Sequence, residues 1–173
     1  MKVILMVVLS CLLAGCVTPQ TLVSSGPFAE LGFDLQSDAA DGVFGQHLYI
    51  AKFQDATCES KERPVIVAKK SKDEPISPIK LPADRPITLA LWYIRGDFGV
   101  NRQCSYTWTF TPIAGGKYVA RADITSDLFC AVNVTDQLSA PVHATHPVTS
   151  CVVGLADKKV SNGRSVIIHY IAR

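Results

Sequence analysis

The stretch CSYTWTFTP, residues 104–112, decides the fold. Its side chains alternate between two kinds, with Cys104, Tyr106, Trp108 and Phe110 on one face of an extended chain and Ser105, Thr107, Thr109 and Thr111 on the other. Unbroken alternation of this kind indicates a β-strand with one buried face. We therefore predict an antiparallel strand whose aromatic face packs on the core and whose threonine face meets solvent.

Strand-like runs flank this stretch on both sides. The run PITLALWYIR at 86–95 is apolar on both faces, as expected of a central strand. After the turn IAGG, the run KYVARADI at 117–124 is expected to return as the second strand of a hairpin. The runs at 47–53 and 64–70 are rich in β-branched and aromatic residues, which predicts strands there. Strands are also predicted at 29–36, where the alternation is weak, and at 129–136 and 165–172.

These runs together predict an all-β fold. About six to nine short strands separated by turn residues, with no capped helical pattern, favour an antiparallel β-sandwich of immunoglobulin or transthyretin type. The proline-rich segment 71–86 interrupts the strands and cannot hold a central one, because each proline removes a backbone donor. It is either a linker between two domains or a long loop within one. We favour the loop, since 29–70 alone is a marginal length for a domain, and we expect one sandwich over residues 29–173.

The first residues have the features of an export signal. Lys2 precedes an apolar run from Val3 to Leu13, which is shorter than the roughly 20 residues that a membrane-spanning helix needs. The tetrapeptide LAGC that ends in Cys16 closely resembles the lipobox of bacterial lipoproteins, a leucine and two small residues before an obligatory cysteine. The alternatives are an ordinary signal peptide with a chance cysteine and a buried N-terminal strand.

The lipobox resemblance implies how the chain is processed and where it is held. Cleavage before Cys16 removes residues 1–15 as the signal peptide, and Cys16 receives a diacylglyceride on its sulfur and an acyl group on its amino group. Residues 16–28 are then a lipidated tether. Two or more acyl chains hold a protein stably at a membrane. Because Val17 rather than aspartate follows the cysteine, the resemblance implies sorting to the outer membrane, with the domain facing the periplasm.

The charge of the chain limits which partners it could bind, and its cysteine content indicates which covalent cross-links it could form. The net charge of +2 falls to +1 when Lys2 leaves with the signal, so no basic field is present to bind nucleic acid. Apart from Cys11 in the signal and the lipidated Cys16, four of the six cysteines are left: Cys58, Cys104, Cys130 and Cys151. Four cysteines in an exported chain indicate two disulfides, with three possible pairings. Zinc-type spacing such as C-x-x-C does not occur, so no metal site is expected.

A second resemblance covers residues 99–130, GVNRQCSYTWTFTPIAGGKYVARADITSDLFC. It is similar to a pattern of small bacterial envelope lipoproteins of unknown function: a cysteine, an aromatic-Thr-Pro, a glycine turn, a tyrosine and a second cysteine. Those families have no assigned catalytic residues. Cys104 and Cys130 flank the predicted hairpin, and the resemblance places two cysteines at those positions. We therefore expect the pair Cys104–Cys130 and, for the other two, Cys58–Cys151.

The expected Cys104–Cys130 pair has a structural consequence. In a plain three-strand meander the two cysteines would lie on strands separated by about twice the 4.8 Å strand spacing. A disulfide needs its Cα atoms within roughly 7 Å. The pairing therefore predicts that the chain crosses from one sheet to the other near residues 125–129.

No motif nominates a catalytic residue or a cofactor. His143 and His146 lie three apart between two prolines, without further ligands nearby, and are expected in a solvated loop. We predict a non-catalytic lipoprotein that binds a protein or glycan partner or supports an envelope assembly. Two alternatives stay open, an accessory lipoprotein of a secretion system and an envelope enzyme or enzyme inhibitor.

Overall fold

The computed structural model describes residues 22, 25–37, 46–54, 65–70, 75–97, 100–126, 129–145 and 164–170. Within these residues there are nine β-strands and no helix, which confirms the all-β prediction. The strands are β1 (Phe28–Ser37), β2 (Gln46–Phe53), β3 (Val65–Lys70), β4 (Ile79–Pro82), β5 (Ile87–Asp97), β6 (Val100–Phe110), β7 (Lys117–Ile124), β8 (Cys130–Asp136) and β9 (Arg164–Tyr170).

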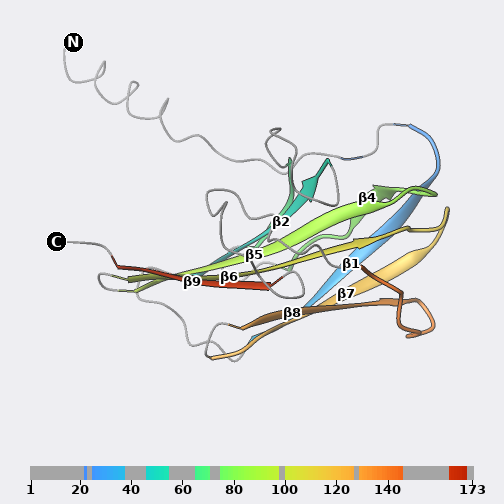
Figure 1. The fold of residues 1–173 in the computed structure, drawn as a ribbon. Coiled ribbons are helices and arrows are strands. Elements are labelled where there is room, and N and C mark those ends of the chain that lie inside the picture. Colours follow the sequence, from blue (N-terminus) through green and yellow to red (C-terminus); the bar gives the residue numbers. More distant parts are fainter. Residues whose placement is uncertain are drawn as a thin grey trace, which may run out of the picture.

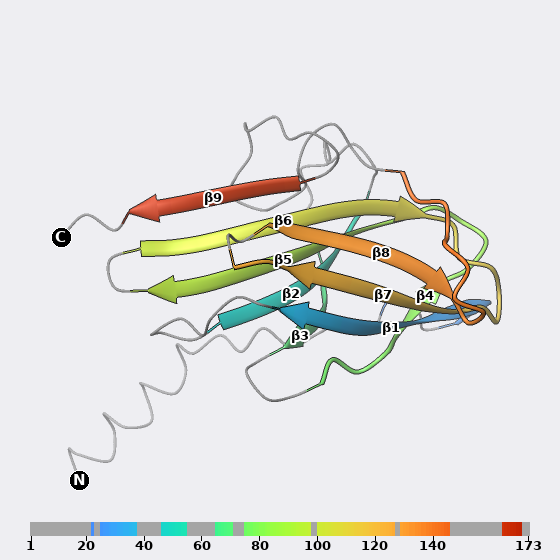
Figure 2. The same ribbon diagram turned by 90° about the horizontal axis from the view of Figure 1, so that it is seen from below.

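The strands form two sheets that pack face to face (Figure 1). One sheet has the order β4-β1-β7-β8 and the other the order β3-β2-β5-β6-β9. Seen from below, the first sheet lies across the face of the second (Figure 2). The predicted β-sandwich is confirmed, and β5 is the middle strand of its sheet, as the two-sided apolar pattern indicated. One pair departs from the prediction, because β1 and β7 run parallel and make the smaller sheet mixed. Alternation shows which face of a strand is buried but not the direction of its neighbour.

The core lies between the two sheets. Leu31 on β1, Leu81 on β4 and Leu89 on β5 are completely buried. The aromatic face of β6 points into the same layer, with Tyr106, Trp108 and Phe110 each at most 5% exposed. The predicted core face of this strand is therefore confirmed.

The proline-rich segment contributes a short strand. β4 has four residues, pairs only with β1, and lies at the edge of the smaller sheet. An edge strand tolerates proline because one side of its ladder has no partner to bond. Because Leu81 of β4 is part of the core, this part of the segment belongs to the sandwich and is not a linker.

The hairpin predicted for β6 and β7 does not form. β6 belongs to the five-stranded sheet and β7 to the four-stranded sheet, so residues 111–116 are an arch that crosses between the sheets. The expected crossing near 125–129 is wrong as well, because β7 and β8 are antiparallel neighbours on either side of that turn. The physical reason is that each strand has one apolar face. Two such faces are buried equally well side by side in one sheet or opposed across the core.

The arch is closed by an aromatic contact. Phe110 at the end of β6 meets Tyr118 on β7 edge to face, with ring centroids 5.5 Å apart. The Tyr118 hydroxyl accepts a hydrogen bond from the backbone N–H of Ile113 at 2.9 Å. A tyrosine hydroxyl that bonds the backbone a few residues upstream is a known way to fix a corner of a sandwich.

The end of the predicted tether is part of the folded structure. Phe28 is the first residue of β1, and its carbonyl accepts a hydrogen bond from Gly115 N at 2.8 Å. The side chain of Leu22 is partly buried against the core. This contact is favourable because an apolar side chain such as Leu22 gains free energy by leaving water.

Candidate binding surface

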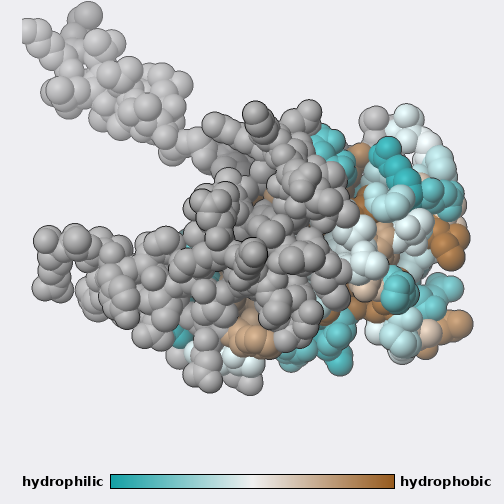
Figure 3. Space-filling view, viewed as in Figure 1, coloured by the Kyte–Doolittle hydropathy of each residue, from teal (hydrophilic) through white to brown (hydrophobic). Residues whose placement is uncertain are grey.

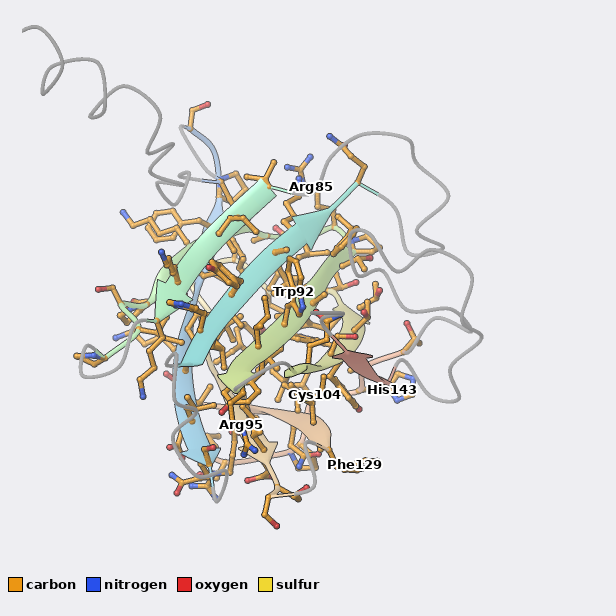
Figure 4. The ribbon with its side chains drawn as sticks, turned by 90° about the vertical axis from the view of Figure 1, so that its left-hand side faces the viewer. Arg85, Trp92, Arg95, Cys104, Phe129 and His143 are labelled. Carbon is orange, nitrogen blue, oxygen red and sulfur yellow. A yellow bond between two sulfur atoms is a disulfide. The ribbon has the colours of Figure 1, made fainter. Side chains whose placement is uncertain are left out.

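The outer face of the five-stranded sheet carries a cluster of aromatic and polar side chains. We call it the aromatic strip, and it consists of His47, Tyr49, Lys69, Trp92 and Gln103. These residues alternate with core residues along their strands, so the twofold period of a strand places them on the side away from the core. Trp92 lies near the middle of the view in Figure 4, beside β2.

Contacts within the aromatic strip fix its geometry. The rings of Tyr49 and Trp92 are cross-strand partners whose centroids lie 5.8 Å apart at 46°. Trp92 Nε1 donates a hydrogen bond to Gln103 Oε1 at 3.1 Å. Lys69 places its ammonium 5.7 Å from the centre of the Tyr49 ring, within the range of a cation–π interaction. The two rings are therefore held in defined positions before any ligand arrives.

The strip offers mixed chemistry to a partner. His47 and Lys69 are exposed, whereas Tyr49 and Trp92 are half-buried and keep part of their rings at the surface. Tyrosine and tryptophan rings are common where proteins meet partners, because they provide apolar contact area at a low cost in conformational entropy. This arrangement suits recognition by contact and provides no nucleophile with an adjacent base.

The predicted threonine face is exposed at Thr111, but within β6 it is closed to solvent, which corrects the prediction there. Ser105, Thr107 and Thr109 are all buried. Trp92 on β5 lies opposite Ser105, and its indole reaches across to Gln103 on β6. Farther along, the hydroxyls of Thr88 and Thr109 bond each other at 2.8 Å. Alternation separates the two faces of a strand without showing which neighbouring side chains cover each.

One of the two expected disulfides lies within the described residues. Cys104 and Cys130 are joined with their Cα atoms 5.8 Å apart, as expected from the resemblance and from their positions. Cys104 is on β6 and Cys130 begins β8, so the bond ties the two sheets together. Both residues are buried. Cys16, Cys58 and Cys151 lie outside the described residues, so the lipid site and the second pairing stay predictions.

The best-defined ion pair is on the outer face of the smaller sheet. Arg121 on β7 contacts Asp34 on β1 at 2.8 Å, and Gln36 donates to the same carboxylate at 2.8 Å. The hydrogen bond from Gln36 and the bond and charge of Arg121 lower the pKa of Asp34 below its ordinary value. A solvent-exposed carboxylate held ionised in this way is not suited to general acid–base work at neutral pH.

Metal and membrane-spanning sites were also considered. His143 is exposed in the segment 141–145, whereas His146 lies outside the described residues. Among the residues with described positions, no three histidine, cysteine, aspartate or glutamate side chains are grouped so that they could hold a metal ion. Within the same residues, no helix is long and apolar enough to cross a membrane.

Comparison with known proteins gives no relative. No protein-family model, no curated protein and no solved structure matches the chain. Function must therefore be argued from the residues themselves.

The aromatic strip was not found from the sequence. A signal was present, because Tyr49 in HLYIAKF and Trp92 in LALWYIR are aromatic residues that fall out of phase with the core positions Leu48, Ile50 and Leu91. Which outward aromatic residues are neighbours depends on strand order and register, and neither is encoded in a single run.

Proposed function

We propose that this chain is a lipid-anchored lipoprotein of the bacterial envelope that binds a protein or glycan partner without catalysis. The lipobox-like sequence that ends in Cys16 supports the anchor. The proposed location is the outer membrane, with the domain facing the periplasm. The disulfide bond between Cys104 and Cys130 is in keeping with an oxidising compartment such as the periplasm.

The observation that carries the binding role is the pair of Tyr49 and Trp92 rings on the outside of the larger sheet. Tyrosine and tryptophan are enriched at binding surfaces because one part of each side chain is apolar and another forms hydrogen bonds. Here the rings lie beside the ammonium of Lys69, so the strip can combine stacking with a charge-assisted hydrogen bond. Sugar rings and the aromatic or acidic side chains of a protein both suit this combination.

The anchor is tested by the substitution Cys16→Ser in the full chain. Metabolic labelling with a fatty acid should mark the unaltered protein and not the variant, which should accumulate as unprocessed precursor. Normal processing of Cys16→Ser, together with an unchanged distribution between membrane and soluble fractions, would show that the lipoprotein proposal is wrong.

The binding role is tested by photo-crosslinking from the strip in intact cells. If the partner is a protein, a photoreactive amino acid at position 47 should crosslink to one defined protein. If the partner is a glycan, the purified chain should co-sediment with purified peptidoglycan. The matched control has the same group at Val119, which is exposed on the outer face of the opposite sheet. Tyr49→Ala should lower the yield from position 47 because it removes one of the two rings.

The outcome at the control position decides the interpretation. Equal crosslinking from positions 47 and 119, or no effect of Tyr49→Ala on the yield from 47, would contradict a role for the aromatic strip. The lipid anchor would not be affected by that result, since it is tested separately at Cys16.

A further inference from the structure

Three large apolar side chains are exposed at one end of the sandwich. They are Phe28 at the start of β1, Ile113 in the arch and Leu138 in the turn after β8, with 41%, 67% and 81% of their surface exposed. We call this group the apolar tip. Figure 3 shows hydrophobic surface at the right-hand end, where β1 begins in Figure 1.

Hydrogen bonds join the segments that carry the tip. Gly115 N in the arch donates a hydrogen bond to Phe28 O at 2.8 Å, and Ile113 N donates one to the Tyr118 hydroxyl at 2.9 Å. On β8, Asp136 lies opposite Tyr118, and its carboxylate accepts from Leu138 N at 2.8 Å. The three side chains are therefore presented together by fixed backbone, although none of them contributes to the buried core.

The chain enters the sandwich at this same end. The predicted tether runs from Cys16 to Phe28, where β1 begins. Leu22 already packs on the core. Only five residues lie between it and Cys16, and the six Cα–Cα steps that join the two span at most about 22 Å when extended. A strand of ten residues such as β1 is about 33 Å long. A lipid on Cys16 would therefore hold the sandwich close to the bilayer, and the first strand begins at the end that carries the tip.

From these observations we infer that the apolar tip inserts into the surface of the lipid bilayer that holds the anchor. The inference rests on the proposed lipid anchor. Charges near the tip are balanced. In the sheet, Glu30 is the partner of Lys80 and of Lys117, Asp84 bonds the arch and is followed by Arg85, and Asp136 bonds Leu138. Two of the carboxylates already accept hydrogen bonds within the protein. Asp84 accepts one from Ala114 N, and Asp136 accepts one from each of two backbone amides of its turn. Insertion is therefore expected to depend on apolar contact and not on anionic lipid.

The test uses the full lipidated chain in phosphatidylcholine vesicles, with or without bromine on the acyl chains. Bromine quenches tryptophan emission only at short range. The variants Ile113→Trp and Leu138→Trp add an indole at the tip. The matched control is Phe129→Trp, because Phe129 is 42% exposed and precedes β8 at the opposite end of the sheet. The native Trp92 and Trp108 give a background that the unaltered protein measures.

The expected result is that brominated lipid removes roughly half or more of the added emission at 113 and 138, since interfacial side chains bury about 5–10 Å into the headgroup and acyl boundary. Emission added at 129 should be unaffected. If the protein floats with the vesicles but neither tip variant is quenched, the proposal that the tip inserts into the bilayer is wrong. A protein partner would then be the remaining occupant for the tip. If the processed chain does not float with vesicles at all, the lipid anchor itself fails, which is a separate outcome.

Discussion

At the scale of single residues, the arch between β6 and β7 depends on very few atoms. Gly116 lies so close to Tyr118 that an added Cβ would be 2.8 Å from the tyrosine ring and 2.9 Å from Ile113 O. Gly115 has a φ of +73°, which is a left-handed conformation that other residues rarely adopt. These two glycines and one tyrosine are what allow the chain to change sheets within six residues.

We expect substitutions in the arch to destabilise the fold in a defined order. Tyr118→Phe should lower the free energy of unfolding by about 1 kcal/mol, because Ile113 N loses its acceptor. Gly116→Ala should cost more, about 2 kcal/mol, because the backbone carbonyl cannot move away from the new methyl group without disturbing the turn. Urea denaturation measures both values. The exposed Val119→Ala is the control, with an expected change within about 0.5 kcal/mol, and a Gly116→Ala protein as stable as this control would refute the packing argument.

The ion pair on the smaller sheet predicts a titration. The pKa of Asp34 should lie below 3.8, first because Gln36 donates to the carboxylate and then because Arg121 does. A folded-state pKa below the unfolded value stabilises the fold at pH values above the unfolded pKa. That contribution is lost as the pH falls through the folded pKa. Carbon-detected NMR titration of the carboxyl group measures it. Gln36→Ala and Arg121→Gln should each raise the value, and an Asp34 pKa at or above 3.8 in the unaltered protein would contradict the assignment.

At the scale of the elements, the Cys104–Cys130 bond joins β6 to β8 across the core. The loop it closes contains the arch, β7 and the turn before β8, with a sequence separation of 26. Hydrogen bonds hold β7 to β1 and β8 within the smaller sheet. Across the core, the disulfide adds a side-chain cross-link between β6 and that sheet, besides the backbone of the arch at 111–116.

Removing this disulfide should destabilise the sandwich strongly. On the chain-entropy model, a loop of this length contributes about 3.5 kcal/mol. The double variant Cys104→Ala/Cys130→Ala should lose about that much in urea denaturation, and somewhat more if the buried sulfurs leave a cavity. Adding a reductant to the variant should then change nothing at this site. A loss below about 1 kcal/mol would mean that the unfolded chain is already constrained, contrary to the model.

At the scale of the whole molecule, the open question is whether the remaining two cysteines form a second disulfide. With Cys104 and Cys130 joined, Cys58 and Cys151 are the two cysteines left once Cys11 of the proposed signal peptide and the proposed lipid site Cys16 are set aside. Their bond would tie the segment before the proline-rich stretch to the C-terminal part of the chain. The loop of 58 to 151 would contribute about 4.6 kcal/mol on the same model.

Peptide mapping without reduction tests this second pairing. We expect one peptide pair that links Cys58 to Cys151 and another that links Cys104 to Cys130, in protein isolated from the envelope. Free thiols at 58 and 151 would contradict the second bridge, although they would leave the described disulfide intact. Links of Cys58 to Cys104 or to Cys130 would instead contradict the strand arrangement described above.

Much of the fold could be predicted from local patterns. The strict alternation of 104–110 gave the buried face of β6, and the two-sided apolar run at 86–95 gave a central strand. These features are local because burial of a strand face requires only that every second residue be apolar. The disulfide Cys104–Cys130 was also anticipated, from position and resemblance. The candidate site was not, since its Tyr49, Trp92 and Lys69 come from three different strands.

By itself, the sequence determined that the chain forms strands, which residues face a core and which residues interrupt the ladder. Only the tertiary structure decided that β6 and β7 lie in opposite sheets, that β1 runs parallel to β7, and that the threonines of β6 are covered. Patterns of apolar residues specify that a face is buried but not what buries it. That choice depends on contacts between segments distant in sequence, such as Phe110 with Tyr118 and Trp92 with Gln103.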